Sequence, residues 1–187
     1  RLIPGDWCLA IDADEVFWDW GLWRLSALMH NADHVVVPML TFWRDFNTIG
    51  VERWRRYAIH KRIFRVQEGM RYENHLCPMM PDGTRFDEMP SVRTVQAPMP
   101  LAAHYAYVKP RAKIEGKLSY YRNQLGMDTI MPNYMTRVWD RWPNAPEEVN
   151  RIGTHPLGGG TCEAWYGRHP KPIQDRIDSG LFGWLGR

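Results

Sequence analysis

The most constraining feature of the sequence is a short apolar run that ends abruptly in three carboxylates. Residues 7–11 follow the turn-forming pair Pro4-Gly5, are too few for a helix, and have the length of a buried strand. Asp12, Asp14 and Glu15 come next, within four residues. Acids at the carboxyl end of such a strand face the crevice in which open α/β sheets bind ligands. The run therefore predicts an α/β fold with a polar site at this edge.

Asp12 and Asp14 lie two residues apart, so on an extended strand their side chains would project to the same side. Hard divalent cations prefer carboxylate oxygens and often share them with the phosphates of a substrate. The pair thus predicts a clamp for a divalent metal and a diphosphate. The alternative is a strand followed by a helix, whose first turn favours acidic residues because of the helix dipole.

Three segments, taken in order, resemble the GT-A-fold, family 2-like glycosyltransferases. Residues 5–15 are similar to that family's Gly-Asp-x-x-Leu-x-Leu-Asp-x-Asp-Glu segment, which carries the Asp-x-Asp motif. Residues 61–65, with Gly69 and the Tyr-Glu-Asn-His of residues 72–75, resemble its Arg-hydrophobic-Phe-Arg strand and acceptor-side loop. Residues 103–108 resemble the late strand whose histidine completes the metal site. The resemblance covers about residues 5–125.

This resemblance implies a GT-A-like mixed sheet flanked by helices. In the family the Asp-x-Asp strand follows a nucleotide-binding half of roughly one hundred residues, the size of a full α/β domain. Here that strand starts near residue 5. We therefore expect the chain to lack the N-terminal nucleotide-binding half, which another segment or chain would supply. Residues 1–126 would form the catalytic portion, and residues 127–187 an irregular and helical extension packed on it.

The resemblance also implies an activity: metal-dependent, inverting transfer of a sugar from a nucleotide-diphosphate sugar to a hydroxyl acceptor. A saccharide, a lipid-linked sugar, a protein and a modified DNA base are all open as acceptors. Asp14 and His104 would bind Mn²⁺ or Mg²⁺, and Asp12 would hold the donor ribose or the water shell of the metal. A mixed set of imidazole nitrogen and carboxylate oxygen suits Mn²⁺. The alternative for His104 is a core histidine with satisfied hydrogen bonds.

Arg62 and Arg65 are candidates for binding the donor phosphates. They lie in a predicted strand over residues 57–66, in which basic and apolar side chains alternate. A guanidinium fork matches phosphate oxygens, although solvated surface arginines are common.

Glu73 and His75 are candidates for the catalytic base. Both lie in residues 69–90, a stretch rich in Met, Pro, Asp and Gly that predicts a long irregular loop. Either side chain could take the proton of the acceptor hydroxyl as that oxygen attacks. Asp87 and Glu88 are competing carboxylates on the same loop.

The remaining patterns predict helices over residues 16–31 and 109–126 and strands over residues 34–40, 92–97 and 101–108. Pro38 should turn the far end of its strand into an edge or a bulge. Near the carboxyl end, Gly167-Arg168-His169-Pro170 resembles the Gly-x-His-Pro of related transferases. This tail could wrap the acceptor side or simply pack against the domain.

Composition places the chain among ordinary globular proteins, with 44% hydrophobic and 24% charged residues. Its net charge of +3 is too small to argue for nucleic acid. Three widely spaced cysteines suggest neither a disulfide framework nor a zinc site, and a reducing cytoplasmic location fits them best. No run approaches the ~20 apolar residues of a transmembrane segment.

Two other functions remain open at this point. One is nucleotidyl or phosphoryl transfer, in which paired acids also hold Mg²⁺. The other is a non-catalytic module whose Trp and Tyr side chains stack on carbohydrate or single-stranded nucleic acid.

Overall fold

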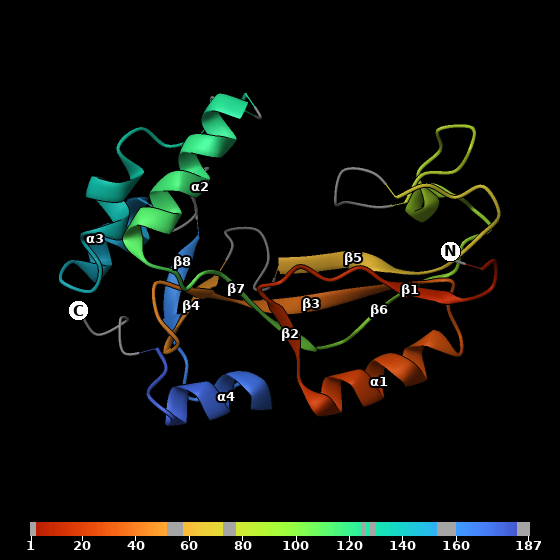
Figure 1. Ribbon diagram of the computed structural model, residues 1–187, viewed down its shortest axis with the longest axis horizontal. Helices are drawn as coiled ribbons and strands as arrows, with labels where there is room; N and C mark the ends of the chain where they lie inside the picture. The colour runs from red at the N-terminus through yellow and green to blue at the C-terminus, as the bar shows by residue number, and fades with distance from the viewer. Residues whose placement is uncertain are drawn as a thin grey trace. The chain divides into compact units, whose positions relative to one another are not determined.

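The computed structural model describes residues 3–51, 58–72, 78–124, 126–127, 130–152 and 160–182. Its strands are β1 (Trp7–Leu9), β2 (Glu15–Phe17), β3 (His34–Trp43), β4 (Thr48–Val51), β5 (Ala58–Arg65), β6 (Thr94–Gln96), β7 (Ala102–Tyr107) and β8 (Thr161–Ala164). Its α-helices are α1 (Asp19–Met29), α2 (Arg111–Gln124), α3 (Pro146–Ile152) and α4 (Lys171–Asp178). A 3₁₀ turn spans Phe86–Glu88, and a π-helix spans Met135–Trp139. The predicted α/β class is confirmed (Figure 1).

The chain divides into two compact units. Unit 1 comprises residues 1–39 and 59–103, and unit 2 comprises residues 40–58 and 104–187. Strands β3, β5 and β7 each begin in one unit and end in the other. The predicted division at residue 126 stays a prediction.

None of the helices in the described ranges is long and apolar enough to cross a bilayer.

The strands of unit 1 combine antiparallel and parallel pairing. β1 runs antiparallel to β5, with Trp7 opposite Arg65 and Leu9 opposite Ile63. The first residues of β3 pair in parallel with β6, so that His34 lies opposite Thr94. β5 lies beside β3 in the strand order. The sheet is therefore mixed, as the sequence predicts.

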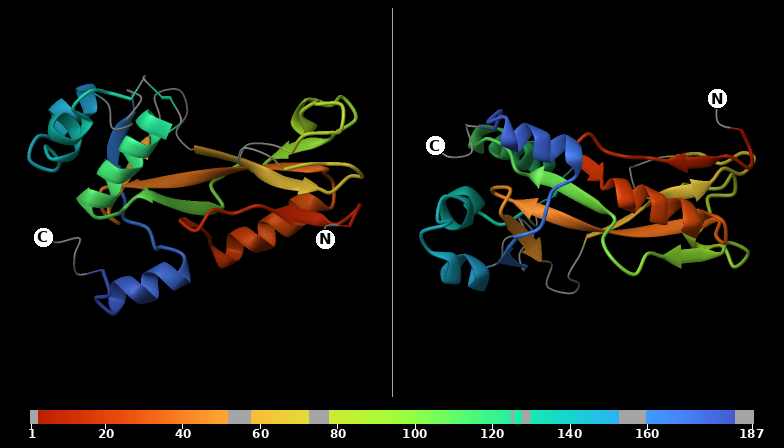
Figure 2. Two further views of the ribbon diagram at one scale, coloured as in Figure 1. Left: turned by 45° about the horizontal axis from the view of Figure 1, so that its top comes forward. Right: turned by 90° about the horizontal axis from the view of Figure 1, so that it is seen from below.

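Helix α1 packs closely against the backbone just before β7. Gly21 is buried, and a Cβ atom added there would overlap the carbonyl oxygen of Leu101. The backbone N–H of Trp18 donates to the same carbonyl oxygen over 3.2 Å. Both views in Figure 2 show α1 beside the strands of unit 1. The predicted helix over residues 16–31 is confirmed only from residue 19, because residues 15–17 form β2, where Glu15 and Phe17 are buried on alternate positions.

The expectation that the far end of the strand after Pro38 is an edge was wrong, and the alternative of a bulge stays a prediction. β3 continues through Pro38 to Trp43, and Thr41 and Phe42 pair with Gly50 and Ile49 of β4. The strand tolerates the proline because the missing N–H is only one of its two backbone polar groups. The carbonyl oxygen of Pro38 still accepts a hydrogen bond from Leu101 N–H over 3.1 Å.

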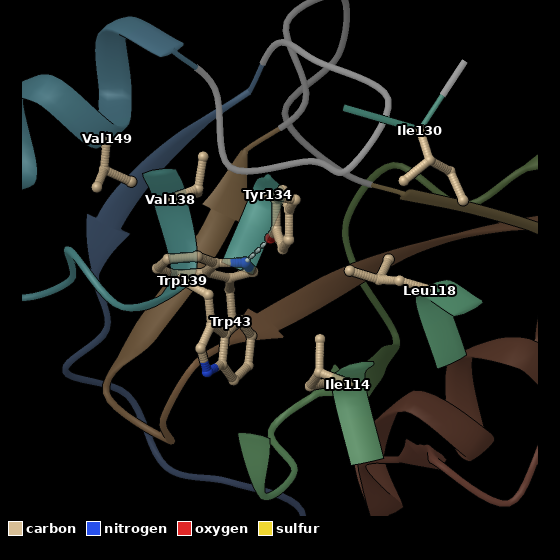
Figure 3. Close-up of a cluster of buried hydrophobic side chains, with 8 residues drawn as sticks. All are labelled: Trp43, Ile114, Leu118, Ile130, Tyr134, Val138, Trp139 and Val149. Atoms are coloured by element: carbon tan, nitrogen blue, oxygen red, sulfur yellow. Dashed lines mark hydrogen bonds between the residues drawn. The ribbon is translucent and has the colours of Figure 1, made fainter. Parts of the chain in front are cut away.

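Unit 2 is built around a cluster of buried apolar and aromatic side chains (Figure 3). Trp43 at the end of β3 packs edge to face against Trp139 of the π-helix, with ring centroids 5.6 Å apart. The indole N–H of Trp43 donates to the hydroxyl of Tyr134 over 3.0 Å. Ile114 and Leu118 supply the apolar face of α2 to this cluster, as their helical spacing predicts. β4 pairs antiparallel with β8 in the same unit.

Candidate functional site: the acidic turn

Asp12 and Asp14 lie in a tight turn between β1 and β2, and Glu15 is the first residue of β2. β1 ends at Leu9, three residues before Asp12, and β2 begins at Glu15. The backbone N–H of Glu15 donates to the carbonyl oxygen of Asp12 over 3.0 Å. In return, the backbone N–H of Asp12 donates to Oε2 of Glu15, also over 3.0 Å. These reciprocal bonds close the turn on itself.

The acids differ in their surroundings. Glu15 is 5% exposed, and its carboxylate accepts a hydrogen bond within the turn. Asp12 is exposed and Asp14 is half-buried. The expectation that Asp12 and Asp14 continue a strand was wrong, so strand alternation gives no reason for them to face the same side. The sequence pattern missed the internal role of Glu15, although a glutamate three residues after a turn-forming aspartate is a recognisable signal for it.

His104 lies on β7 and is half-buried. It belongs to unit 2, whereas Asp14 belongs to unit 1. Neither unit by itself therefore contains both predicted metal ligands. In the described part of the chain, His, Cys, Asp and Glu side chains form no group of three or more that could hold a metal ion.

Arg65 already has three partners within unit 1. Its guanidinium lies 5.2 Å from the ring centroid of Trp7. Its Nη1 donates to the carbonyl oxygen of Gly5 over 3.4 Å, and its Nε lies 3.7 Å from Oδ1 of Asp33. Because Arg65 pairs with the first residue of β1, it lies at the end of that strand away from the acidic turn.

Arg62 lies on β5, next to Ile63, which is opposite the last residue of β1. Its backbone is thus nearer the acidic turn than that of Arg65. The side chain of Arg62 lies outside the described residues, so its predicted contact with donor phosphates stays a prediction.

Glu73 and His75 also lie outside the described residues. The chain on either side is anchored, because Arg71 and Met79 exchange two backbone hydrogen bonds of 2.8 and 2.7 Å. Phe86 is buried with Phe64 and Val66, and Met70, Met80 and Met89 of this loop pack against that cluster.

Asp87, a competing base in the sequence, is held by two cationic side chains. Arg85 donates to both of its carboxylate oxygens, from Nε over 3.0 Å and from Nη2 over 2.8 Å. Nζ of Lys61 lies 3.4 Å from Oδ2. The Asp87 side chain is only 8% exposed. These contacts favour a structural role for Asp87. Glu73, His75 and the exposed Glu88, whose Oε1 lies 3.4 Å from Nε of Arg85, are left as candidates for the base.

Comparison with known proteins adds no relatives to this description. No protein-family model matches the chain, and neither a curated protein nor a solved structure matches it.

Proposed function

We propose that this chain is the catalytic part of a metal-dependent, GT-A-type glycosyltransferase that moves a sugar from a nucleotide-diphosphate donor to a hydroxyl acceptor. The observation that carries the proposal is the acidic turn. The Glu15 carboxylate closes the turn by accepting the N–H of Asp12. The two aspartates of the Asp-x-Asp motif lie in the same turn, where Asp12 is exposed and Asp14 is half-buried. This arrangement supports a role for the aspartates as metal and donor ligands.

In this proposal Asp14 would hold Mn²⁺ or Mg²⁺ together with the donor diphosphate. The metal would neutralise charge that develops on the departing diphosphate. Asp12 would hold the donor ribose or the water shell of the metal. Glu73 or His75 would accept the proton of the attacking hydroxyl, and Arg62 would contact a donor phosphate.

The test is thermal unfolding of the full-length protein with UDP, GDP, CDP or dTDP, each with and without Mn²⁺. A ligand at 100 times its Kd stabilises the native state by about 2.7 kcal/mol. For a chain of this length that corresponds to a Tm increase of about 5–10 °C. We expect one nucleotide to produce such an increase, and only when Mn²⁺ is present.

Asp14→Asn should remove most of this increase, because the amide is a poorer and uncharged metal ligand. The matched control is Glu68→Gln, which removes an exposed acid of the same unit. Glu68 lies just after β5. That end of β5 pairs with the start of β1, away from the acidic turn, so the control variant should keep the nucleotide-dependent increase in Tm. If no nucleotide shifts the Tm, or if both variants respond like the native protein, the donor site is not at the acidic turn. Release of nucleoside diphosphate from the matching sugar donor then tests turnover.

A further inference from the structure

A second candidate site lies entirely within unit 2, at the loop that joins β3 to β4. A cavity of about 470 Å³ opens there. The loop contributes Asp45, Phe46 and Asn47 to its wall, and α4 contributes Gln174 and Ile177. The volume is in the range of small-molecule sites, which is about 300–1,000 Å³. Figure 1 shows α4 beside the β4 and β8 end of this unit.

The cavity wall is held in place by His169, from the Gly-x-His-Pro segment that the proposed reaction does not use. Nδ1 of His169 lies 2.9 Å from the hydroxyl of Tyr105, and the ring packs edge to face against that of Phe46 with centroids 5.5 Å apart. Its centroid lies 4.7 Å from that of Phe42. Burial lowers the pKa of His169, so the ring is neutral at neutral pH. The imidazole therefore ties the loop to the core instead of offering charge to a ligand.

The loop itself presents two polar side chains to the cavity. Oδ1 of Asp45 accepts the backbone N–H of Asn47 over 2.8 Å, which fixes the carboxylate on the loop. Within the described ranges, Oδ2 of Asp45 and the carboxamide of Asn47 have no hydrogen-bond partner. Gln174 is already engaged, because its Oε1 accepts the N–H of His169 over 3.3 Å. The cavity thus offers a fixed carboxylate and an adjacent amide.

The chemistry of the wall points to a neutral, polyhydroxylated ligand. A carboxylate oxygen accepts a hydroxyl proton, and a carboxamide can both donate and accept. Ile177 supplies half-buried apolar surface at the wall, whereas the ring of Phe46 is 9% exposed and already packs against Tyr105, His169 and Phe182. The described lining includes no Lys or Arg to bind an anion. We propose that this cavity is a binding site for a neutral saccharide, contacted by Asp45 and Asn47.

This site goes beyond the proposed donor site and stands whether or not that site exists. Asp14 and Asn47 belong to different units, so the two proposals can fail separately. Asp14→Asn should keep saccharide binding, and Asn47→Ala should keep the nucleotide-dependent increase in Tm.

The test is titration calorimetry of the full-length protein with the methyl glycosides of glucose, galactose and mannose and with N-acetylglucosamine. We expect saturable binding of at least one. Asn47→Ala should weaken it about 3- to 10-fold, the range expected for one lost neutral hydrogen bond. This variant keeps the backbone bonds of the loop, including Trp165 N–H to the carbonyl oxygen of Asn47 over 2.7 Å. Asp45→Asn, which keeps an oxygen for the loop bond, should also weaken binding.

The matched control is Asn123→Ala, which removes an exposed amide of α2 outside the cavity and should leave the affinity within about two-fold. Glucuronate tests the charge of the site, because the Asp45 carboxylate should make it bind more weakly than the neutral sugars. Three results would overturn the proposal: no probe binds, Asn47→Ala binds as well as the control, or glucuronate binds at least as tightly as the neutral probes.

Discussion

Replacing Gly21 with alanine should destabilise the protein, although alanine is the better helix former by about 1 kcal/mol. The added Cβ would overlap the carbonyl oxygen of Leu101 and would lie 3.2 Å from its carbonyl carbon. Overpacking of this kind costs about 1–3 kcal/mol. Moving α1 away would also weaken the 3.2 Å bond from Trp18 N–H to Leu101, worth about 1 kcal/mol. The net expected loss in the free energy of unfolding is about 1–3 kcal/mol.

Gly116 in α2 provides the matched control. It is exposed, and a Cβ added there would meet nothing within 4 Å. Gly116→Ala should therefore show the helix propensity alone and stabilise the protein by about 1 kcal/mol. Urea unfolding followed by far-UV circular dichroism should separate the two variants by about 2–4 kcal/mol. If Gly21→Ala is as stable as Gly116→Ala, α1 does not pack against Leu101 as described.

Two further predictions concern unit 2. Tyr134→Phe removes the acceptor of the buried Trp43 indole N–H and should cost about 1–3 kcal/mol in urea unfolding, whereas the exposed Tyr120→Phe should change stability by less than about 0.5 kcal/mol. Equal effects would contradict the buried hydrogen bond. Hydrogen bonds from Arg111 lower the pKa of Asp140, so the pair stabilises the fold above the unfolded pKa of about 3.9 and loses that contribution as the pH falls. Arg111→Gln should therefore be less stable than the native protein at about pH 7, and the difference should shrink as the pH falls below the unfolded pKa; a difference that does not shrink in acid would contradict this linkage.

Elements with a strong local pattern could be predicted from the sequence. The β-branched residues 35–37 lie in β3, and the apolar spacing of Ile114 and Leu118 forms the buried face of α2. The basic and apolar alternation over residues 57–66 corresponds to β5. In β3 and α2 the residues that carry the pattern are also buried, so local and tertiary preferences agree.

Elements that depend on distant partners could not be predicted. β8 exists because residues 161–164 pair with β4, more than one hundred residues earlier in the chain. α4 has no fully buried side chain; its only apolar repeat is the half-buried pair Ile173 and Ile177, and its ion pairs are exposed ones such as Lys171 with Asp175. The three residues of β2 are too few to show a period. The two compact units were equally hidden, because β3 belongs to both.

The acidic turn shows how the residues of a candidate site could be predicted without its geometry. A glutamate side chain is long enough to reach back three residues, and Glu15 uses that length to accept the N–H of Asp12. Asp12 is consequently held at both backbone polar groups while its side chain remains exposed. A ligand side chain on a fixed backbone loses less conformational entropy when it binds. The case for Asp12 and Asp14 as ligands thus rests on turn closure by the third acid, instead of on the strand alternation that the sequence suggested.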